Sequence, residues 1–195
     1  MHKLERPESL NELTKAKKAY KGTIPPEEAW KNFGKDGSRT KVRKQLESVQ
    51  NDLCAYCENS LENNGHIDHF KPKVDWKVTF EWNNLVVSCT HNDSCGGKKS
   101  KHYEDYWINP YEEDPKELFI FRTNGKIKGT TADANKIIED FGLNSPRLKR
   151  KRGELLSFLT DEFLSDSDTL EYYKNMDYPM FPTAHKQIIE KISGE

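Results

Sequence analysis

Four cysteines within residues 54–95 place the strongest constraint on how this 195-residue chain folds. They form two pairs, a Cys54-Ala-Tyr-Cys57 turn and a Cys89/Cys95 pair with five residues between its members. A Cys-x2-Cys turn directs two sulfurs at one tetrahedral ion, and a second pair completes a four-thiolate set matched to zinc. His91 lies inside the second loop and could replace one thiolate. Because four protein ligands leave no open position, this zinc is predicted to be structural, and a functional ion must bind elsewhere.

A His66-Ile-Asp68-His69 cluster between the two cysteine pairs is the candidate reaction centre. An imidazole with an ordinary pKa near ~6.5 accepts a proton at neutral pH, and a carboxylate is a hard ligand suited to magnesium or manganese. Neighbours in a regular strand point to opposite faces, so Asp68 and His69 share a site only where the strand bends or ends. Pro72 favours such an end. His66 would lie on the Asp68 face as an additional ligand.

Two further segments bear on this centre. Asn84 precedes an apolar run that predicts a buried strand, and its side chain is expected to bridge loop backbone and hold His69 in orientation. Gly96-Gly97 before Lys98 and Lys99 is typical of a helix start whose basic groups face phosphate. The alternative interpretation of Lys98 and Lys99 is an ordinary run of solvent-exposed lysines, which has the same pattern.

The segments on either side have mostly helical periodicity. Asn124-Gly125 between two apolar runs predicts a β-hairpin. Five cations lie between residues 147 and 152, where a solvated face and a nucleic-acid or acidic-partner surface are equally consistent with the pattern. Helices are expected over 9–20 (with a Ser9/Glu12 capping box), from Pro26 to Gly34, from Ser38 to Val49, over 132–141, from Pro146 along a face reaching Phe163, and near 168–175 and 183–192.

Composition limits the classes of protein that fit. The formal net charge is -1, whereas nucleic-acid binders usually carry a basic excess, so any such surface must be a local patch or come from a partner. No apolar run approaches the ~20 residues of a membrane helix, and the first residues have no apolar signal core. A cytoplasmic protein with no membrane partner is therefore expected. In a reducing compartment, clustered cysteines favour metal over disulfides.

The order of these motifs resembles that of HNH endonucleases with the ββα-metal fold: Cys-x2-Cys, Asp-His with a following Pro, Asn-Leu, then Cys and Cys-x3-Lys. The resemblance extends to the HNH subunits of Septu-type anti-phage systems, some of them retron-associated. It rests on four further motifs: the Cys-Ala-Tyr-Cys-Glu opening, His-Phe-Lys-Pro-Lys, Phe-x-Trp-x-Asn-Leu and the Asn-Gly hairpin. The resemblance implies an α+β protein with a zinc-stapled ββα-metal core (50–108). An N-terminal helical segment (1–49) and a C-terminal hairpin and helical region (109–195) flank this core.

The resemblance also implies roles for the matching residues. His69 is implied as general base, Asp68 as the ligand of a catalytic Mg²⁺ or Mn²⁺, and Asn84 as the middle Asn of the motif. Lys99 is implied as its closing Lys. The implied partners are a nucleic acid, DNA or RNA, and an ATPase subunit related to ABC and SMC proteins. The implied zinc ligands are Cys54, Cys57, Cys89 and Cys95.

Gly96 departs from the family pattern, because the residue after the last Cys is usually an Asn or His that completes the catalytic metal site. A zinc-stapled module that binds nucleic acid or a partner without cutting it therefore stays open. The near-neutral charge also leaves open a structural subunit that docks an ATPase. The third metal ligand is open among His66, His91, Asn92, Asp93 and His102.

Overall fold

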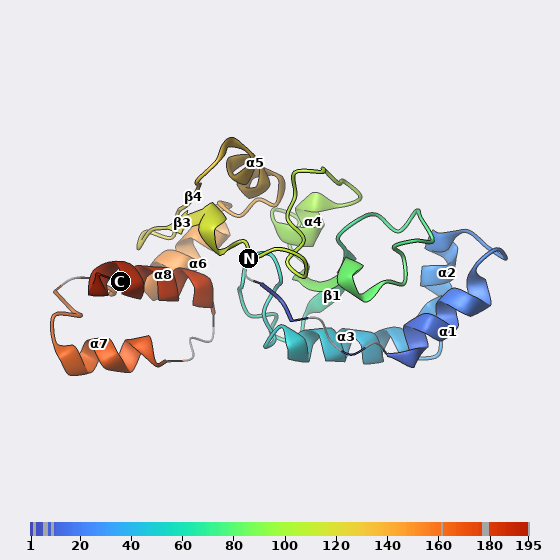
Figure 1. Ribbon diagram of the computed structural model, residues 1–195, viewed down its shortest axis with the longest axis horizontal. Helices are drawn as coiled ribbons and strands as arrows, with labels where there is room; N and C mark the ends of the chain where they lie inside the picture. Colours follow the sequence, from blue (N-terminus) through green and yellow to red (C-terminus); the bar gives the residue numbers. More distant parts are fainter. Residues whose placement is uncertain (2, 6–7, 9, 161, 177–179, 195) are drawn as a thin grey trace.

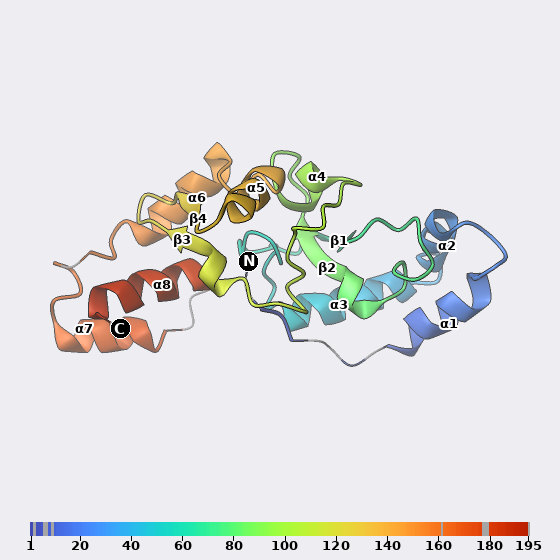
Figure 2. The same ribbon diagram turned by 45° about the horizontal axis from the view of Figure 1, so that its top comes forward.

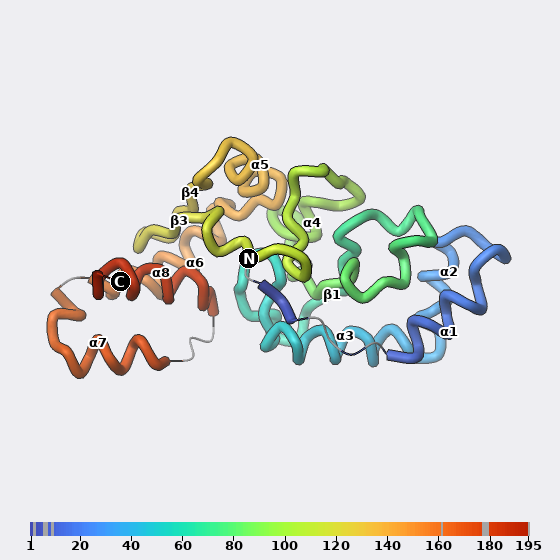
Figure 3. Tube along the Cα trace, viewed as in Figure 1, coloured from blue at the N-terminus to red at the C-terminus, as the bar shows by residue number. Residues whose placement is uncertain are grey.

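Two short antiparallel sheets lie among helices in the computed structural model, which gives the chain an α+β fold (Figure 1). The structure describes residues 1, 3–5, 8, 10–160, 162–176 and 180–194. The start of the chain lies near the middle of the elongated molecule, and the last helix lies at one end of it (Figure 3). Among the described residues, no helix has both the length and the apolar character needed to cross a bilayer.

The first three helices are those that the sequence predicts. Proline at its first position, where the missing N–H costs nothing, starts α2 (Pro26–Phe33). A left-handed Gly37 precedes α3 (Ser38–Val49). The first helix, α1 (Asn11–Tyr20), begins two residues later than expected, and Ser9 of the expected capping box lies outside the described residues.

The central sheet pairs β1 (Gly65–His69) with β2 (Leu85–Cys89), so that His69 lies opposite Leu85 and Gly65 opposite Cys89. The 3-10 turn η1 (Trp82–Asn84) leads into β2, and α4 (Cys95–Lys99) follows it. Every residue of β2 is buried, because α3 and α4 both pack against this strand. In Figure 2, α3 runs below the sheet and α4 lies above it.

The C-terminal part contains the second sheet and the remaining helices. The predicted Asn124-Gly125 turn is present, with Gly125 in the left-handed region (φ 78°) and its N–H donating to the Arg122 carbonyl at 2.8 Å. Most of the predicted helices in this part are also present. The elements are η2 (Lys116–Leu118), β3 (Phe119–Phe121), β4 (Ile127–Gly129), α5 (Ala132–Asp140), α6 (Pro146–Leu156), α7 (Ser167–Lys174) and α8 (Pro182–Ser193).

The helix that starts at Pro146 is shorter than predicted. It ends at Leu156, and the Leu159 N–H then bonds the Leu156 carbonyl at 3.1 Å in a turn that carries the fully buried Leu159 into the core. The chain direction changes there, so Phe163 does not lie on the helix face and is 43% exposed. Phe163 packs instead against Phe158, at 5.4 Å between ring centroids.

The basic run on α6 contains one buried cation and four that are partly or fully exposed. Arg152 is completely buried and donates to the carbonyls of Gly125 (2.8 Å) and Leu143 (2.5 Å). Arg152 therefore belongs to the interior, whereas Arg150 lies on a solvated face of α6, where its side chain is 72% exposed. The other paired members of the run are Arg147 with Asp93 and Ser94, Arg150 with Glu154, and Lys151 with Glu62.

Candidate active site

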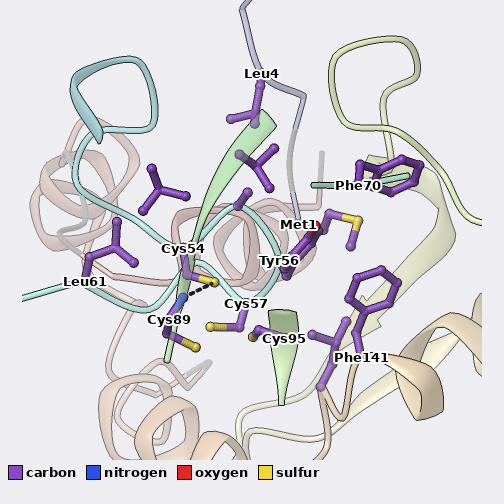
Figure 4. Packing of buried hydrophobic residues seen from close by; sticks show 14 of the residues in the cluster. Met1, Leu4, Cys54, Tyr56, Cys57, Leu61, Phe70, Cys89, Cys95 and Phe141 are labelled. Atoms are coloured by element: carbon purple, nitrogen blue, oxygen red, sulfur yellow. Dashed lines mark hydrogen bonds between the residues drawn. The ribbon is translucent and has the colours of Figure 1, made fainter. Parts of the chain in front are cut away.

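The four cysteines come together at the junction of three elements. Cys54 and Cys57 lie in the turn after α3, Cys89 ends β2 and Cys95 begins α4. All four are buried, and their Sγ atoms lie within 4.8 Å of one another (Figure 4). The Cys89 N–H donates to Cys54 Sγ at 3.4 Å, and the Cys95 N–H donates to the Phe141 carbonyl at 2.7 Å. The wide spacing of the second pair therefore does not prevent convergence.

This cluster has the ligand type and number of a structural zinc site. Zn–S bonds of about 2.3 Å in a tetrahedron place sulfurs about 3.8 Å apart, close to the observed grouping. Burial, together with the neighbouring thiols, raises the pKa of Cys95 well above its usual range. Four thiolates this close together are stable only beside a cation. His91 is exposed, and the cluster does not include it.

His69 ends β1 and is only 5% exposed. Its Nε2 lies 3.1 Å from the Thr79 carbonyl oxygen, and the Trp30 ring of α2 meets its ring edge-on at 4.4 Å between centroids. A carbonyl only accepts, so Nε2 carries the proton and Nδ1 keeps a free lone pair. Burial, with a contribution from Lys73, lowers the pKa of His69 to about 3. The imidazole is therefore neutral at physiological pH and able to accept a proton.

Asn84 fixes the loop that orients His69. Its Oδ1 accepts from the Lys71 N–H at 2.7 Å, and its Nδ2 donates to the carbonyls of Lys71 (2.9 Å) and Val78 (3.0 Å). Val78 precedes Thr79, whose carbonyl contacts the His69 ring. The side chain therefore bridges both ends of the 71–78 loop.

We expect Asn84→Ala to lower the free energy of unfolding by about 1–3 kcal/mol, since three backbone groups lose their partner. Asn83→Ala is the matched control, because among the described residues the side-chain amide of Asn83 hydrogen-bonds only to the exposed Glu112 side chain, at 3.3 Å. Urea unfolding of the zinc-loaded chain measures both variants. Equal losses of stability in the two variants would contradict the bridging role of Asn84.

Asp68 is held by two buried side chains. The Tyr56 hydroxyl donates to Oδ2 at 2.6 Å, and Lys99 Nζ lies 3.3 Å from the same oxygen. Lys99 Nζ also donates to the His69 carbonyl at 2.7 Å. Both contacts go to Oδ2, so Oδ1 is the oxygen with which Asp68 can bind an ion.

This arrangement differs from the expected placement of Lys99. The residue is 2% exposed, and its ammonium group connects α4 to β1 by its contacts with the His69 carbonyl and the Asp68 carboxylate. Because this group is paired internally, it does not face solvent or a phosphate. Lys98, beside it, is exposed. No sequence pattern predicts a role for Tyr56, because nothing marks the second intervening position of a Cys-x2-Cys turn as a partner for a carboxylate twelve residues away.

His66 and Asp68 converge on Gly96. A Cβ placed on Gly96 would lie 3.2 Å from His66 Nε2, 3.2 Å from Asp68 Cγ and 3.0 Å from Ser88 Oγ. The absence of a side chain therefore leaves a small space between a carboxylate and an imidazole. The other imidazole nitrogen, His66 Nδ1, is buried and has no hydrogen-bond partner among the described residues.

Four other candidates for the third ligand lie elsewhere. His91, Asn92 and Asp93 are in the exposed loop between Cys89 and Cys95, and Asp93 pairs with Arg147 at 3.5 Å. His102 pairs with Glu104 at 2.8 Å. None of the four lines the pocket that contains Asp68.

That pocket has a volume of about 240 Å³. Asp68 and His69 both line it although they are neighbours, because β1 ends at His69. Lys73 and Lys101 supply positive charge, and Lys101 pairs with Glu27 of α2 at 2.8 Å. Its wall is formed by Glu27, His66, Ile67, Asp68, His69, Pro72, Lys73, Gly96, Ser100 and Lys101.

Two curated proteins are similar to this chain. Septu protein PtuB of Bacillus mycoides (strain KBAB4) is 26% identical over 185 residues, which cover 75% of this chain and 59% of that protein. The chain resembles PtuB. It is also 28% identical over 132 residues to "Retron Vc95 putative HNH endonuclease" of Vibrio cholerae serotype O1 biovar El Tor, over 60% of this chain and 63% of that protein.

The similarity to PtuB and to the retron protein agrees with the motif order that resembles HNH endonucleases. The chain spans about three fifths of the length of each relative. No family model matches the chain.

Proposed function

We propose that this chain is a metal-dependent HNH endonuclease that hydrolyses nucleic-acid phosphodiester bonds. The observation that carries the proposal is the convergence of three groups on one small pocket: neutral His69, the carboxylate of Asp68, and His66 beside Gly96. The order β1, β2, α4 around this pocket supports a ββα-metal core. The names of two distant relatives support a nuclease.

The residues beside Gly96 fit a divalent cation. Asp68 Oδ1 is an uncommitted hard oxygen, His66 directs Nε2 at the same space, and Gly96 leaves room that a Cβ would fill. Asp68 and His66 would hold Mg²⁺ or Mn²⁺ there, with water and substrate oxygens as the remaining ligands. When bound, such an ion stabilises negative charge on the phosphate and on the leaving oxygen.

The chain's own residues supply the rest of the reaction. His69 Nδ1 takes the proton from the attacking water, while Thr79 and Trp30 hold the ring and keep Nε2 protonated. Asn84 fixes the loop that carries Thr79. Lys73, in the pocket wall, binds the substrate phosphate.

The direct test is to incubate the zinc-loaded chain with plasmid DNA and with total RNA, with and without added Mg²⁺ or Mn²⁺. The expected result is cleavage of one of these substrates that needs the added ion and is absent in Asp68→Asn. A folded, zinc-loaded chain that binds nucleic acid but cuts neither substrate would contradict the proposal and favour a binding module.

The resemblance to PtuB and to the retron protein supports a role as the nuclease of an anti-phage system. In this proposal an ATPase subunit related to ABC and SMC proteins is the partner. The cleavage test is therefore also run with an added ATPase subunit of this class. Faster cutting with the ATPase is the result expected if it controls the nuclease.

A further inference from the structure

Four cations surround a groove on the side of α4 away from the Asp68 pocket. Lys98 belongs to α4, while Arg122, Lys126 and Lys128 belong to the β3–β4 hairpin, and all four are exposed. They line a groove of about 770 Å³. Within the described residues, none of these four forms an ion pair with a carboxylate. This separates them from the basic run on α6, whose charges are largely paired or buried.

The groove has a net positive lining. Its two acidic residues are Asp93 and Glu139. Asp93 is already paired with Arg147 at 3.5 Å and accepts from the Ser94 hydroxyl at 2.9 Å. Glu139 is therefore the one acidic residue of the lining that is not in an ion pair within the described residues, against four unpaired cations. A concave surface of this charge attracts a polyanion.

The hairpin that carries three of the cations is firmly held. The Asn144 side chain accepts from the Ile127 N–H at 2.9 Å and donates to the Ile127 carbonyl at 2.8 Å. Asn135 accepts from the Gly129 N–H at 3.0 Å, and Arg152 donates to the Gly125 carbonyl at 2.8 Å. Little ordering of the backbone is then needed when the hairpin binds a ligand.

The groove and the Asp68 pocket share α4 as a wall. Gly96 lines the pocket, whereas Lys98 lines the groove and approaches Gly142, where a Cβ would lie 2.9 Å from Lys98 Cδ. A five-residue helix is about 7.5 Å long, which is about two nucleotide steps along one strand. Figures 1 and 2 show α5 and the hairpin on one side of α4.

We propose that this groove, defined by Lys98, Arg122, Lys126 and Lys128, binds the sugar–phosphate backbone of the nucleic acid whose scissile bond lies in the Asp68 pocket. The inference rests on the proposed function and extends it by giving the substrate a path over α4. The contacts are to phosphates, so the groove contributes affinity without reading base sequence.

The test measures binding of labelled 20-nucleotide single-stranded DNA, 20-base-pair DNA and a hairpin RNA by fluorescence anisotropy. The His69→Ala background prevents cleavage. The groove variant carries Arg122→Gln, Lys126→Gln and Lys128→Gln. The matched control carries Lys15→Gln, Lys18→Gln and Lys21→Gln, three exposed lysines on or next to α1, at the far end of the molecule in Figure 1.

The groove variant is expected to bind at least about tenfold more weakly at low salt. The slope of log affinity against log salt should fall by about 2–3, the loss expected for three phosphate contacts. The α1 variant should bind as the parent does. The inference would be overturned if the groove variant bound as tightly as the parent, or if both variants were weakened equally. It would also be overturned if the parent bound none of the three nucleic acids.

These outcomes are separable from those of the cleavage test. If the chain cuts nucleic acid through His69 but the groove variant binds normally, the nuclease proposal stands and the groove inference falls. If only the groove variant loses binding but the parent cuts nothing, the groove binds nucleic acid and the proposed chemistry falls.

Discussion

Replacing His69 with alanine is expected to lower the rate of metal-dependent cleavage by about 10²–10⁴-fold, the usual contribution of a general base. The protein should remain folded and zinc-loaded, because the zinc ligands and the central β1–β2 pairing do not use the imidazole. His102→Ala removes an exposed histidine outside the pocket and should cleave as the parent does. Cleavage is followed with the substrate that the parent cuts.

Two further measurements separate a proton-accepting role from a structural one. Added imidazole should restore part of the activity of His69→Ala, since it can occupy the space that the ring leaves. The pKa of His69 is lowered to about 3, so the neutral form persists as pH falls from 8 to 5, and a nearby cation would lower the pKa further. Protonation of His69 should therefore not reduce cleavage over that range. An undiminished rate in His69→Ala would contradict its role as the base.

Removing zinc is expected to unfold the central part of the chain. Zinc binding to structural thiolate sites contributes about 10–16 kcal/mol, which is comparable with the whole stability of about 5–15 kcal/mol of an ordinary domain. The cluster joins the turn after α3, the end of β2 and the start of α4. Its loss is therefore also expected to release Gly96 from the Asp68 pocket and Lys99 from its contact with Asp68.

The measurement compares the parent and Cys57→Ser by elemental analysis for zinc, circular dichroism and thermal unfolding. The parent should carry one zinc per chain, and Cys57→Ser should carry little zinc and lose its cooperative transition. Chelation should have the same effect on the parent, and re-added zinc, but not magnesium, should reverse it. A zinc-free parent with an unchanged unfolding transition would show that the thiols need no metal.

Local patterns predicted the parts of the fold that local chemistry determines. The Cys54/Cys57 turn, the Asn124-Gly125 hairpin and the helix starting at Pro26 depend on residues close together in the chain, and each is present in the structure. The end of α6 was not predictable in this way. There Leu159 is buried in a hydrophobic core that also contains residues distant in sequence.

The same limit applies to the charges of the site. Lys98 and Lys99 are adjacent in the sequence, yet Lys98 is exposed and Lys99 is buried against Asp68. Arg152 likewise lies within a run of cations but is completely buried. Which cation of a run is paired depends on carboxylates and carbonyls from other elements. The sequence also left five residues open as the third metal ligand, and only the packing of Gly96 against His66 distinguishes one of them.

The cation site between His66 and Asp68 is tested most directly by titrating the zinc-loaded chain with Mn²⁺ and recording the free ion by electron paramagnetic resonance. One bound Mn²⁺ per chain is predicted, with affinity at least about tenfold weaker in His66→Ala and in Asp68→Asn. Asp133→Asn, which removes an exposed carboxylate on α5, should bind Mn²⁺ as the parent does. No bound Mn²⁺ in the parent, or equal affinity in His66→Ala, Asp68→Asn and the parent, would contradict the site.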